Sequence, residues 1–167
     1  FQRRVRSVSC GSSHTVFVTR NGQAYAFGKG LYGKLGDGDA TDHNVVIPHQ
    51  ILGPFQGRVS SVSCGHSHTV LVTEDGKAYG FGNGSYGKLG DGDTTAHNVL
   101  IPRKIYSQDQ VVSVSCAIEH TILITTKTLL PFPFDADLED YYRKQEAFKK
   151  RMDQLKQQQQ STWCTVL

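Results

Sequence analysis

The stretch that decides the fold is VRSVSCGSSHTVFVTRNGQAYAFGKGLYGKLGDGD, residues 5–39, because it returns nearly unchanged as VSSVSCGHSHTVLVTEDGKAYGFGNGSYGKLGDGD, residues 59–93. The two copies begin at Val5 and Val59 and align without a gap at an offset of 54 residues. A shorter third copy, VSVSCAIEHTILIT, begins at Val112. Self-similarity at a fixed period of this length is the signature of a repeat architecture.

A glycine-rich segment in each full copy imitates a nucleotide-binding loop. Residues 28–34 read G-x-x-x-x-G-K, but Leu35 stands where a phosphate loop needs Ser or Thr, and Leu89 does so in the second copy. Turn-forming residues follow instead of a helix whose N-terminus could face a phosphate. We therefore expect no nucleotide cofactor here, and we interpret the glycines as positions that need positive φ or close chain approach. These are Gly28, Gly30, Gly33, Gly82, Gly84 and Gly87.

Composition limits the class of protein. The chain has 167 residues and a net charge of +3, which by itself does not indicate a nucleic-acid partner. No apolar run reaches the length of a membrane-spanning helix. The first residue is Phe, which indicates a chain that was cut or truncated.

Each full copy predicts four short strands. In the second copy these cover residues 59–64, 68–73, 77–82 and 98–105, with Asp75-Gly76 forming a tight hairpin turn. Pro102 places the last of them at an edge or an end of its sheet. Four strands in about fifty residues, repeated along the chain, predict one propeller blade per copy.

The repeated unit V-x-x-V-S-C-G-x-x-H-T-x-x-V-T-x-x-G-x-A-Y-x-F-G-x-G-x-Y-G-K-L-G resembles the repeat of the regulator of chromosome condensation family. The resemblance runs from Val5 to Thr125 and implies a seven-bladed β-propeller. It also implies that the glycines above and the recurring Cys and His are structural repeat positions. The latter are Cys10, His14, Cys64, His68, Cys116 and His120.

The third copy departs from this pattern. Ala117 replaces the glycine after the cysteine, and nothing like A-Y-x-F-G follows. We therefore predict an all-β partial β-propeller, with two full four-stranded blades and half of a third, followed by a C-terminal α-helix and a flexible tail. The predicted segments are a propeller over 1–130 (repeats at about 5–58, 59–110 and 111–126), a linker and amphipathic helix over 131–160, and a tail over 161–167.

A ring must close to hide its strand edges. We expect this chain to be the C-terminal third of a larger ring, completed by strands from an absent N-terminus, and poorly soluble alone. The alternative is a short protein that pairs with copies of itself.

The recurring C-x-x-x-H pairs do not predict a metal site. Zinc needs four converging ligands, whereas these pairs fall one to a blade, so we expect buried thiols and satisfied core histidines. The Asp-Gly-Asp segments at 37–39 and 91–93 suggest calcium weakly, but Pro48 and Pro102 stand at the twelfth position, where a calcium loop has Glu. No catalytic constellation is visible, so we expect no enzyme. Unpaired cysteines favour a reducing compartment.

The resemblance implies two functions. The family contains a guanine-nucleotide exchange factor for the small GTPase Ran, which uses a projecting hairpin, and many scaffolds. No insertion between the two full copies could form such a hairpin. We therefore predict a protein-binding module that scaffolds or regulates a small-GTPase pathway; the alternative is an exchange factor for a Ran-like GTPase. Binding is expected at exposed loop residues that differ between repeats. Examples are Lys29, Leu31, Asp42 and His43 against Asn83, Ser85, Ala96 and His97.

After Pro131 the composition changes to a predicted helix, DADLEDYYRKQEAFKKRMDQLKQQQQ. Asp135 or Asp137 could cap its N-terminus. A weak apolar stripe leaves open whether it packs on the propeller, stands in solvent or forms a coiled coil with a partner. The stripe comprises Leu138, Tyr141, Gln145, Phe148, Met152 and Leu155, with Gln145 as its polar interruption.

The last four residues, Cys164-Thr165-Val166-Leu167, fit a C-a-a-X prenylation signal. A terminal Leu favours a geranylgeranyl group on Cys164. Basic residues upstream could add attraction to an anionic membrane, so we expect a cytoplasmic, membrane-associated protein. They are Lys149, Lys150 and Arg151. Two alternatives stay open: capture of the free terminus by a PDZ domain, and a cysteine placed there by chance.

Overall fold

The computed structural model describes residues 4–126, apart from 56, 94, 106 and 108, together with the backbone of 129–131. The predicted helix and tail, with Lys149, Lys150, Arg151 and Cys164, lie outside these described residues. The segment boundaries given above stay a prediction. No helix in the described part is long and apolar enough to cross a membrane.

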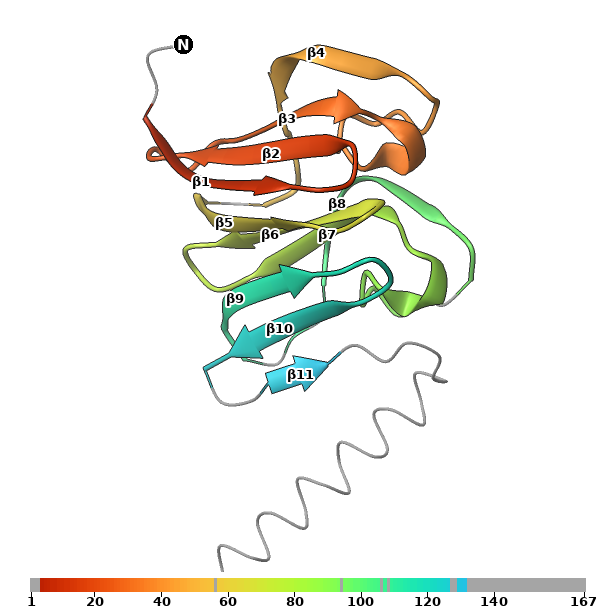
Figure 1. Cartoon of the computed structure of the whole chain (residues 1–167). Helices are drawn as coiled ribbons and strands as arrows, with labels where there is room; N and C mark the ends of the chain where they lie inside the picture. The colour runs from red at the N-terminus through yellow and green to blue at the C-terminus, as the bar shows by residue number, and fades with distance from the viewer. Residues whose placement is uncertain are drawn as a thin grey trace, which may run out of the picture. The chain divides into compact units, whose positions relative to one another are not determined.

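Three antiparallel sheets make up the described chain, which confirms the all-β partial propeller (Figure 1). In the first and second sheets, four consecutive strands pair in chain order; in the third, the order is β11-β10-β9. The first sheet consists of β1 (Val5–Cys10), β2 (His14–Thr19), β3 (Ala24–Lys29) and β4 (Asn44–Gln50). The second consists of β5 (Val59–Cys64), β6 (His68–Thr73), β7 (Ala78–Asn83) and β8 (Asn98–Lys104). The third consists of β9 (Val111–Cys116), β10 (Thr121–Thr125) and β11 (Leu129–Pro131).

The third sheet has one strand more than the sequence predicts. β11 pairs with β10, with Leu130 opposite Leu123. The prediction of two strands after residue 111 is therefore wrong. Residues 126–128, Thr-Lys-Thr, include no Gly, Asn or Asp, so no turn signal marks a hairpin there.

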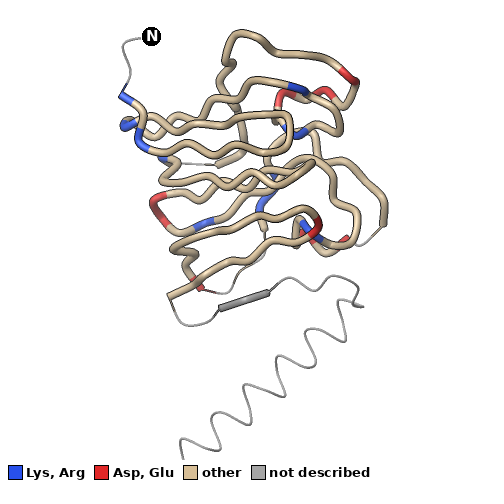
Figure 2. The backbone as a smooth tube through the Cα atoms, in the orientation of Figure 1, with Lys and Arg blue, Asp and Glu red and all other residues tan. Residues whose placement is uncertain are grey.

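Local sequence explains the hairpins of the two full repeats. Gly22 and Gly76 have φ of 78° and 74°, a conformation that glycine adopts without the strain a Cβ would cause. In the second repeat the Thr73 hydroxyl donates to the backbone carbonyl of Lys77 at 3.0 Å and accepts from the backbone N–H of Lys77 at 3.1 Å. Each turn thus closes on a threonine at the end of the preceding strand. Figure 2 shows charged residues mainly in the turns and loops, with few along the strands.

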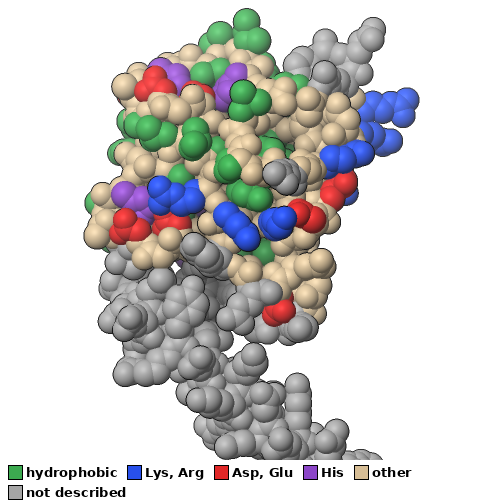
Figure 3. Space-filling model, turned by 180° about the vertical axis from the view of Figure 1, so that it is seen from behind, with side chains coloured by type: hydrophobic (Ala, Val, Ile, Leu, Met, Phe, Trp, Pro, Cys, Tyr) green, Lys and Arg blue, Asp and Glu red, His purple; other side chains and the backbone are tan. Residues whose placement is uncertain are grey.

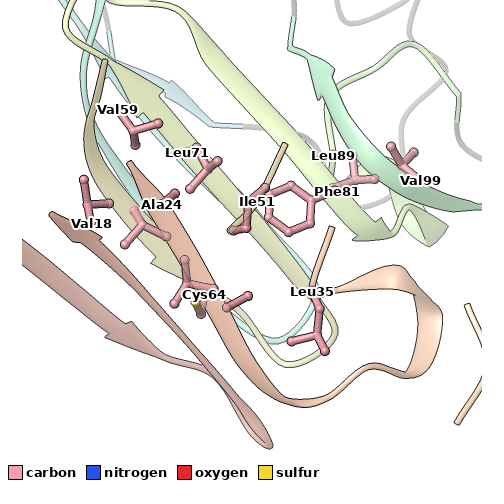
Figure 4. Close-up of a cluster of buried hydrophobic side chains, with 13 residues drawn as sticks. Val18, Ala24, Leu35, Ile51, Val59, Cys64, Leu71, Phe81, Leu89 and Val99 are labelled. Atoms are coloured by element: carbon pink, nitrogen blue, oxygen red, sulfur yellow. The ribbon is translucent and has the colours of Figure 1, made fainter. Parts of the chain in front are cut away.

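The sheets pack face to face, and two apolar clusters fill the spaces between them. The larger lies between the first and second sheets and includes Val18 of β2, Leu71 of β6 and Phe81 of β7 (Figure 4). The smaller cluster joins the second sheet to the third. Both sides of the second sheet are therefore covered.

The outer faces of the first and third sheets are open in the described structure. Val8 of β1 is 62% exposed, whereas its counterpart Val62 in the middle sheet is 8% exposed. Ile124 of β10 is 45% exposed and its counterpart Val72 is 1% exposed. The same repeat position is thus buried where a neighbouring sheet packs on it and exposed where none does.

Candidate functional site

Histidine and threonine form a repeated link between neighbouring sheets. His14 Nε2 lies 2.8 Å from Thr69 Oγ1 of the second sheet, and Thr69 donates to the backbone carbonyl of Lys34 at 3.0 Å. His68 and Thr121 repeat the arrangement, at 2.9 Å, and Thr121 donates to the Lys88 carbonyl at 2.8 Å. We call these two arrangements the His–Thr links.

The direction of these hydrogen bonds fixes the form of each imidazole. Because the threonine hydroxyl gives its proton to a carbonyl, it must accept from a protonated Nε2. The Nδ1 atoms of His14 and His68 are buried and lack a hydrogen-bond partner within the described residues. Burial lowers the pKa of His14 to about 4, with the charge of Lys34 adding to the effect. Burial and then Lys88 lower the pKa of His68 to about 3. Both rings are neutral at physiological pH, so they act as structural donors.

Within the described residues, the third repeat does not form this link. A Cβ added at Gly65 would collide with the His68 ring and would lie 2.5 Å from the Ala117 carbonyl oxygen. Ala117, at the equivalent place, carries such a Cβ, although its N–H bonds the His120 carbonyl in the same turn, at 2.9 Å. His120 is exposed. By analogy with Gly65, the Cβ of Ala117 is incompatible with a ring at the place that His14 and His68 occupy, and the described residues include no following repeat with a threonine for His120.

The three repeat cysteines have different surroundings. Cys64 is buried, its N–H bonds the Ser9 hydroxyl at 2.9 Å, and burial raises its pKa to about 12. Cys116 bonds Ser63 in the same way, and burial raises its pKa to about 11. Cys10 is exposed. The expectation that every Cys–His pair is buried is wrong for Cys10, whose side of β1 has no sheet packed on it in the described part, and for His120.

The glycine-rich loops are tight structural turns. Each contains a short 3-10 turn, η1 (Leu31–Gly33) or η2 (Ser85–Gly87), where a phosphate loop would begin a long helix. The positive φ that the sequence predicts occurs at four of the six glycines: Gly28, Gly33, Gly82 and Gly87. At Gly30 and Gly84 the cause is close packing instead, because an added Cβ would collide with the rings of His43 and His97.

The lysines of the P-loop-like segments are buried and bonded to protein side chains. Lys34 and Lys88 are 4% and 2% exposed. Lys34 Nζ donates to Ser13 Oγ at 3.0 Å, and Lys88 Nζ pairs with Glu119 Oε2 at 2.6 Å. A lysine that serves phosphate keeps its ammonium available at the loop. Lys34 instead bonds a residue of its own repeat, and Lys88 bonds a residue of the next repeat.

His43 and His97 tie the ends of the long loops together. His43 contacts Asp37 Oδ2 at 2.8 Å through Nε2 and the Thr41 carbonyl at 3.0 Å through Nδ1. These hydrogen bonds raise the pKa of His43. His97 makes the same contacts with Asp91 and Thr95 at 3.0 and 2.8 Å, and its pKa is also raised. Figure 3 shows histidine and acidic side chains together at two places on one face.

The exposed part of these loops differs between the repeats, as the sequence predicts for a binding surface. Lys29 pairs with Asp42 at 3.1 Å in the first repeat. Asn83 stands at the position of Lys29 and contacts Asn98 at 3.5 Å, and the exposed Ala96 replaces Asp42. Among the described residues no group of three His, Cys, Asp or Glu side chains could hold a metal ion.

Sequence reasoning missed four residues of this arrangement. It did not assign Thr69 and Thr121 as the acceptors of the His–Thr links, nor Lys34 and Lys88 as buried residues. The available signal was the recurrence of His-Thr and Lys-Leu-Gly in both full copies. The pairing of each histidine with the threonine of the next repeat is a tertiary fact.

Comparison with known proteins places the chain among repeat proteins of one kind. The family models of the regulator of chromosome condensation (RCC1) repeat match residues 21–72 and 75–124, and also 5–34 and 59–88. The chain is 35% identical over 124 residues to the ultraviolet-B receptor UVR8 of Arabidopsis thaliana, covering 74% of this chain and 28% of UVR8. It is 40% identical over 128 residues to the X-linked retinitis pigmentosa GTPase regulator of Canis lupus familiaris, covering 75% of this chain and 13% of that protein.

A solved structure supports the fold. The crystal structure of Prp20p from Saccharomyces cerevisiae, studied for its binding to Gsp1p and histones, matches with a TM-score of 0.65 at 18% identity, covering 89% of this chain and 35% of that one. The chain therefore spans about a third or less of each of these relatives. Because the repeat models match most of the described residues, and the repeats fold into propeller-like sheets, the chain belongs to the regulator of chromosome condensation (RCC1) repeat family.

Proposed function

We propose that this chain is part of a protein-binding β-propeller that scaffolds or regulates a small-GTPase pathway. The observation that carries the proposal is the division of each repeat into a constant frame and a variable rim. His, Thr and Gly residues of the frame recur at matching positions, whereas the exposed Asp42 of the first loop is Ala96 in the second. Surface positions that vary on a fixed frame are where repeat proteins bind their partners.

A small GTPase as the partner class is supported by the relatives. One is named a GTPase regulator, and Prp20p has been studied for binding to Gsp1p. The alternative proposal is that the whole protein is a guanine-nucleotide exchange factor for a Ran-like GTPase. Within this segment, the gapless alignment of the two full repeats favours binding over exchange, because it leaves no projecting hairpin between them.

The test separates binding from exchange. The purified chain is immobilised, and a panel of small GTPases is assayed for retention and, separately, for release of a fluorescent guanine nucleotide. Scaffolding predicts retention of a GTPase with no faster release of its nucleotide. Faster release supports the exchange factor. A Lys29→Ala/Asp42→Ala variant should lose retention, whereas the same change at Lys77 and Asp75, an exposed pair at a hairpin turn, is the matched control. Absence of both activities across the panel contradicts the proposal.

We propose further that Cys164 carries a geranylgeranyl group and that the protein is cytoplasmic and membrane-associated. The proposal rests on the C-a-a-X terminus and on the nearby basic residues of the sequence. One lipid chain gives only reversible membrane binding, so Lys149, Lys150 and Arg151 would supply the second attraction. A PDZ domain bound to the free C-terminus is the competing partner.

A further inference from the structure

Lys34 is a buried cation with an incomplete set of partners. It is 4% exposed, and its Nζ donates to Ser13 Oγ at 3.0 Å. Among the described residues, no carboxylate lies close enough to form an ion pair with it. An ammonium group has three donors, and burying a charge without an opposite charge is unfavourable.

The next repeat shows what completes such a site. Lys88, the counterpart of Lys34, is 2% exposed and pairs with Glu119 Oε2 at 2.6 Å across the junction of the second and third sheets. Glu119 is the third residue after Cys116, and the third residue after Cys64 is Ser67. The junction of the first and second sheets therefore has the lysine but lacks the carboxylate.

The surroundings of Lys34 leave a positive excess. Burial lowers the pKa of Lys34, and the nearby charge of Lys29 lowers it further. Asp42 opposes this effect, but its carboxylate is already paired with Lys29 at 3.1 Å. Ser13, whose hydroxyl Lys34 contacts, is an exposed residue. Ser13 is therefore the side from which we expect an anion to approach.

We propose that Lys34 Nζ and Ser13 Oγ bind the carboxylate of an Asp or Glu side chain that a partner protein supplies. Lys34 donates its free N–H groups to the carboxylate, and the Ser13 hydroxyl, while accepting from Lys34, donates its own proton to the second oxygen. The partner's carboxylate does at the first junction what Glu119 does at the second. The inference rests on the proposed protein-binding function only for the source of the carboxylate.

The test follows the Lys34 side chain by NMR in the full chain labelled at its lysines. Sodium acetate is titrated against sodium chloride at equal ionic strength. Acetate should shift the Lys34 signal to saturation and raise the pKa of Lys34, while Lys88, which already has Glu119, serves as the internal control and should not respond. A Lys34 signal that moves no more in acetate than in chloride overturns the proposal.

Variants separate this site from general charge effects. Ser67→Glu should supply the missing carboxylate and abolish the response of Lys34 to acetate, whereas Ser67→Gln, the neutral control, should keep it. Because Ser67 is buried and its variants could fail to fold, Ser13→Ala at the exposed hydroxyl is the second test. Loss of that hydrogen bond should weaken acetate binding by about tenfold, equivalent to about 1.4 kcal/mol. Equal acetate binding by the Ser13→Ala variant contradicts the assigned role.

The source of the carboxylate is tested with a short Glu-containing peptide and its Gln counterpart. Preference for the Glu peptide, lost in Lys34→Gln, supports a protein ligand. Binding of acetate without such a preference overturns the protein source and leaves only a carboxylate site. The GTPase panel is an independent experiment. If no GTPase is retained or loses its nucleotide faster, while the Lys34 signal still responds to acetate, the proposed function is rejected and the carboxylate site is not.

Discussion

His68 and Thr121 hold the second and third sheets together: Nε2 of His68 lies 2.9 Å from Oγ1 of Thr121, with the imidazole fully buried. The Thr121 hydroxyl in turn donates a hydrogen bond to the Lys88 carbonyl. A strand of one repeat, a strand of the next and the glycine-rich loop of the first are thus joined by two hydrogen bonds.

Thr121→Val should destabilise the protein by about 1–3 kcal/mol, the cost of leaving buried polar groups without a partner. The change keeps the shape of the side chain but removes the hydrogen bonds of the hydroxyl to His68 and to the Lys88 carbonyl. Urea unfolding monitored by circular dichroism measures it, and the exposed Thr126→Val is the matched control. His68→Ala should cost a similar or larger amount. Unfolding curves that coincide with that of the wild type would contradict a structural role for the link.

Stability should fall as the pH is lowered from about 6.5 towards 3–4. The pKa of His14 is lowered to about 4 and that of His68 to about 3, whereas both rise to the ordinary 6.5 on unfolding. The unfolded chain therefore binds more protons across this interval, and the stabilisation, complete above pH 6.5, is lost progressively below it. Thermal unfolding at a series of pH values measures the slope. In a His14→Gln/His68→Gln variant the slope should be shallower, and an unchanged slope would assign the pH dependence to other groups.

Gly65→Ala should destabilise the protein by about 1–3 kcal/mol, in the range of overpacked sites. The added methyl group meets the His68 ring and the Ala117 carbonyl, so it should force His68 out of its link with Thr121. NMR titration of the imidazole measures its pKa. In the variant, the pKa of His68 should rise towards the ordinary value of about 6.5. Ala117→Gly, in the repeat that lacks the link, is the control and should change stability little. A variant with Gly65→Ala that keeps the His68–Thr121 contact would refute this explanation of Ala117.

The repeat thiols should react in a fixed order. Cys10 is exposed, whereas burial raises the pKa of Cys64 to about 12 and that of Cys116 to about 11. The thiolate is the reactive form, so iodoacetamide at pH 7.5 should modify Cys10 first. Peptide mass spectrometry of the native and the urea-unfolded chain distinguishes the sites. Equal rates at Cys10 and Cys64 in the native chain would disprove the difference in burial.

Cys164→Ser should abolish membrane association in eukaryotic cells. The wild-type C-terminal peptide should carry a geranylgeranyl group on Cys164, and Leu167→Ser should keep a lipid but favour farnesyl, because the last residue selects the transferase. Mass spectrometry of the peptide and cell fractionation measure the two effects, and attachment should weaken with salt. An unmodified Cys164 with Leu167 still present, or a Ser variant that stays on membranes, would reject prenylation and favour the PDZ interaction.

The strands of the full repeats were predictable because each carries its own signal. His68–Thr73 is rich in Thr, Val and Leu, and the Asp75-Gly76 turn that follows needs no distant contact to form. β11 was not predictable, since Thr126 to Thr128 contain no turn residue and Leu129–Pro131 gains its place only by pairing with β10. The candidate carboxylate site was not predictable either. An alignment of the repeats shows Lys34 and Lys88 as identical residues, but it does not show that Lys34 contacts Ser13 of its own repeat whereas Lys88 contacts Glu119 of the next.

The sequence by itself determined the repeat, its strands and its tight turns, since these depend on side chains close together along the chain. Only the tertiary structure decided which copies of a repeated residue have the same burial and the same partners. His14 and His68 are buried donors and His120 is exposed; Cys64 is buried and Cys10 is exposed. The physical reason is that the environment of each position is made by the neighbouring sheet, and identical residues differ where that neighbour, or a single methyl group at Ala117, differs.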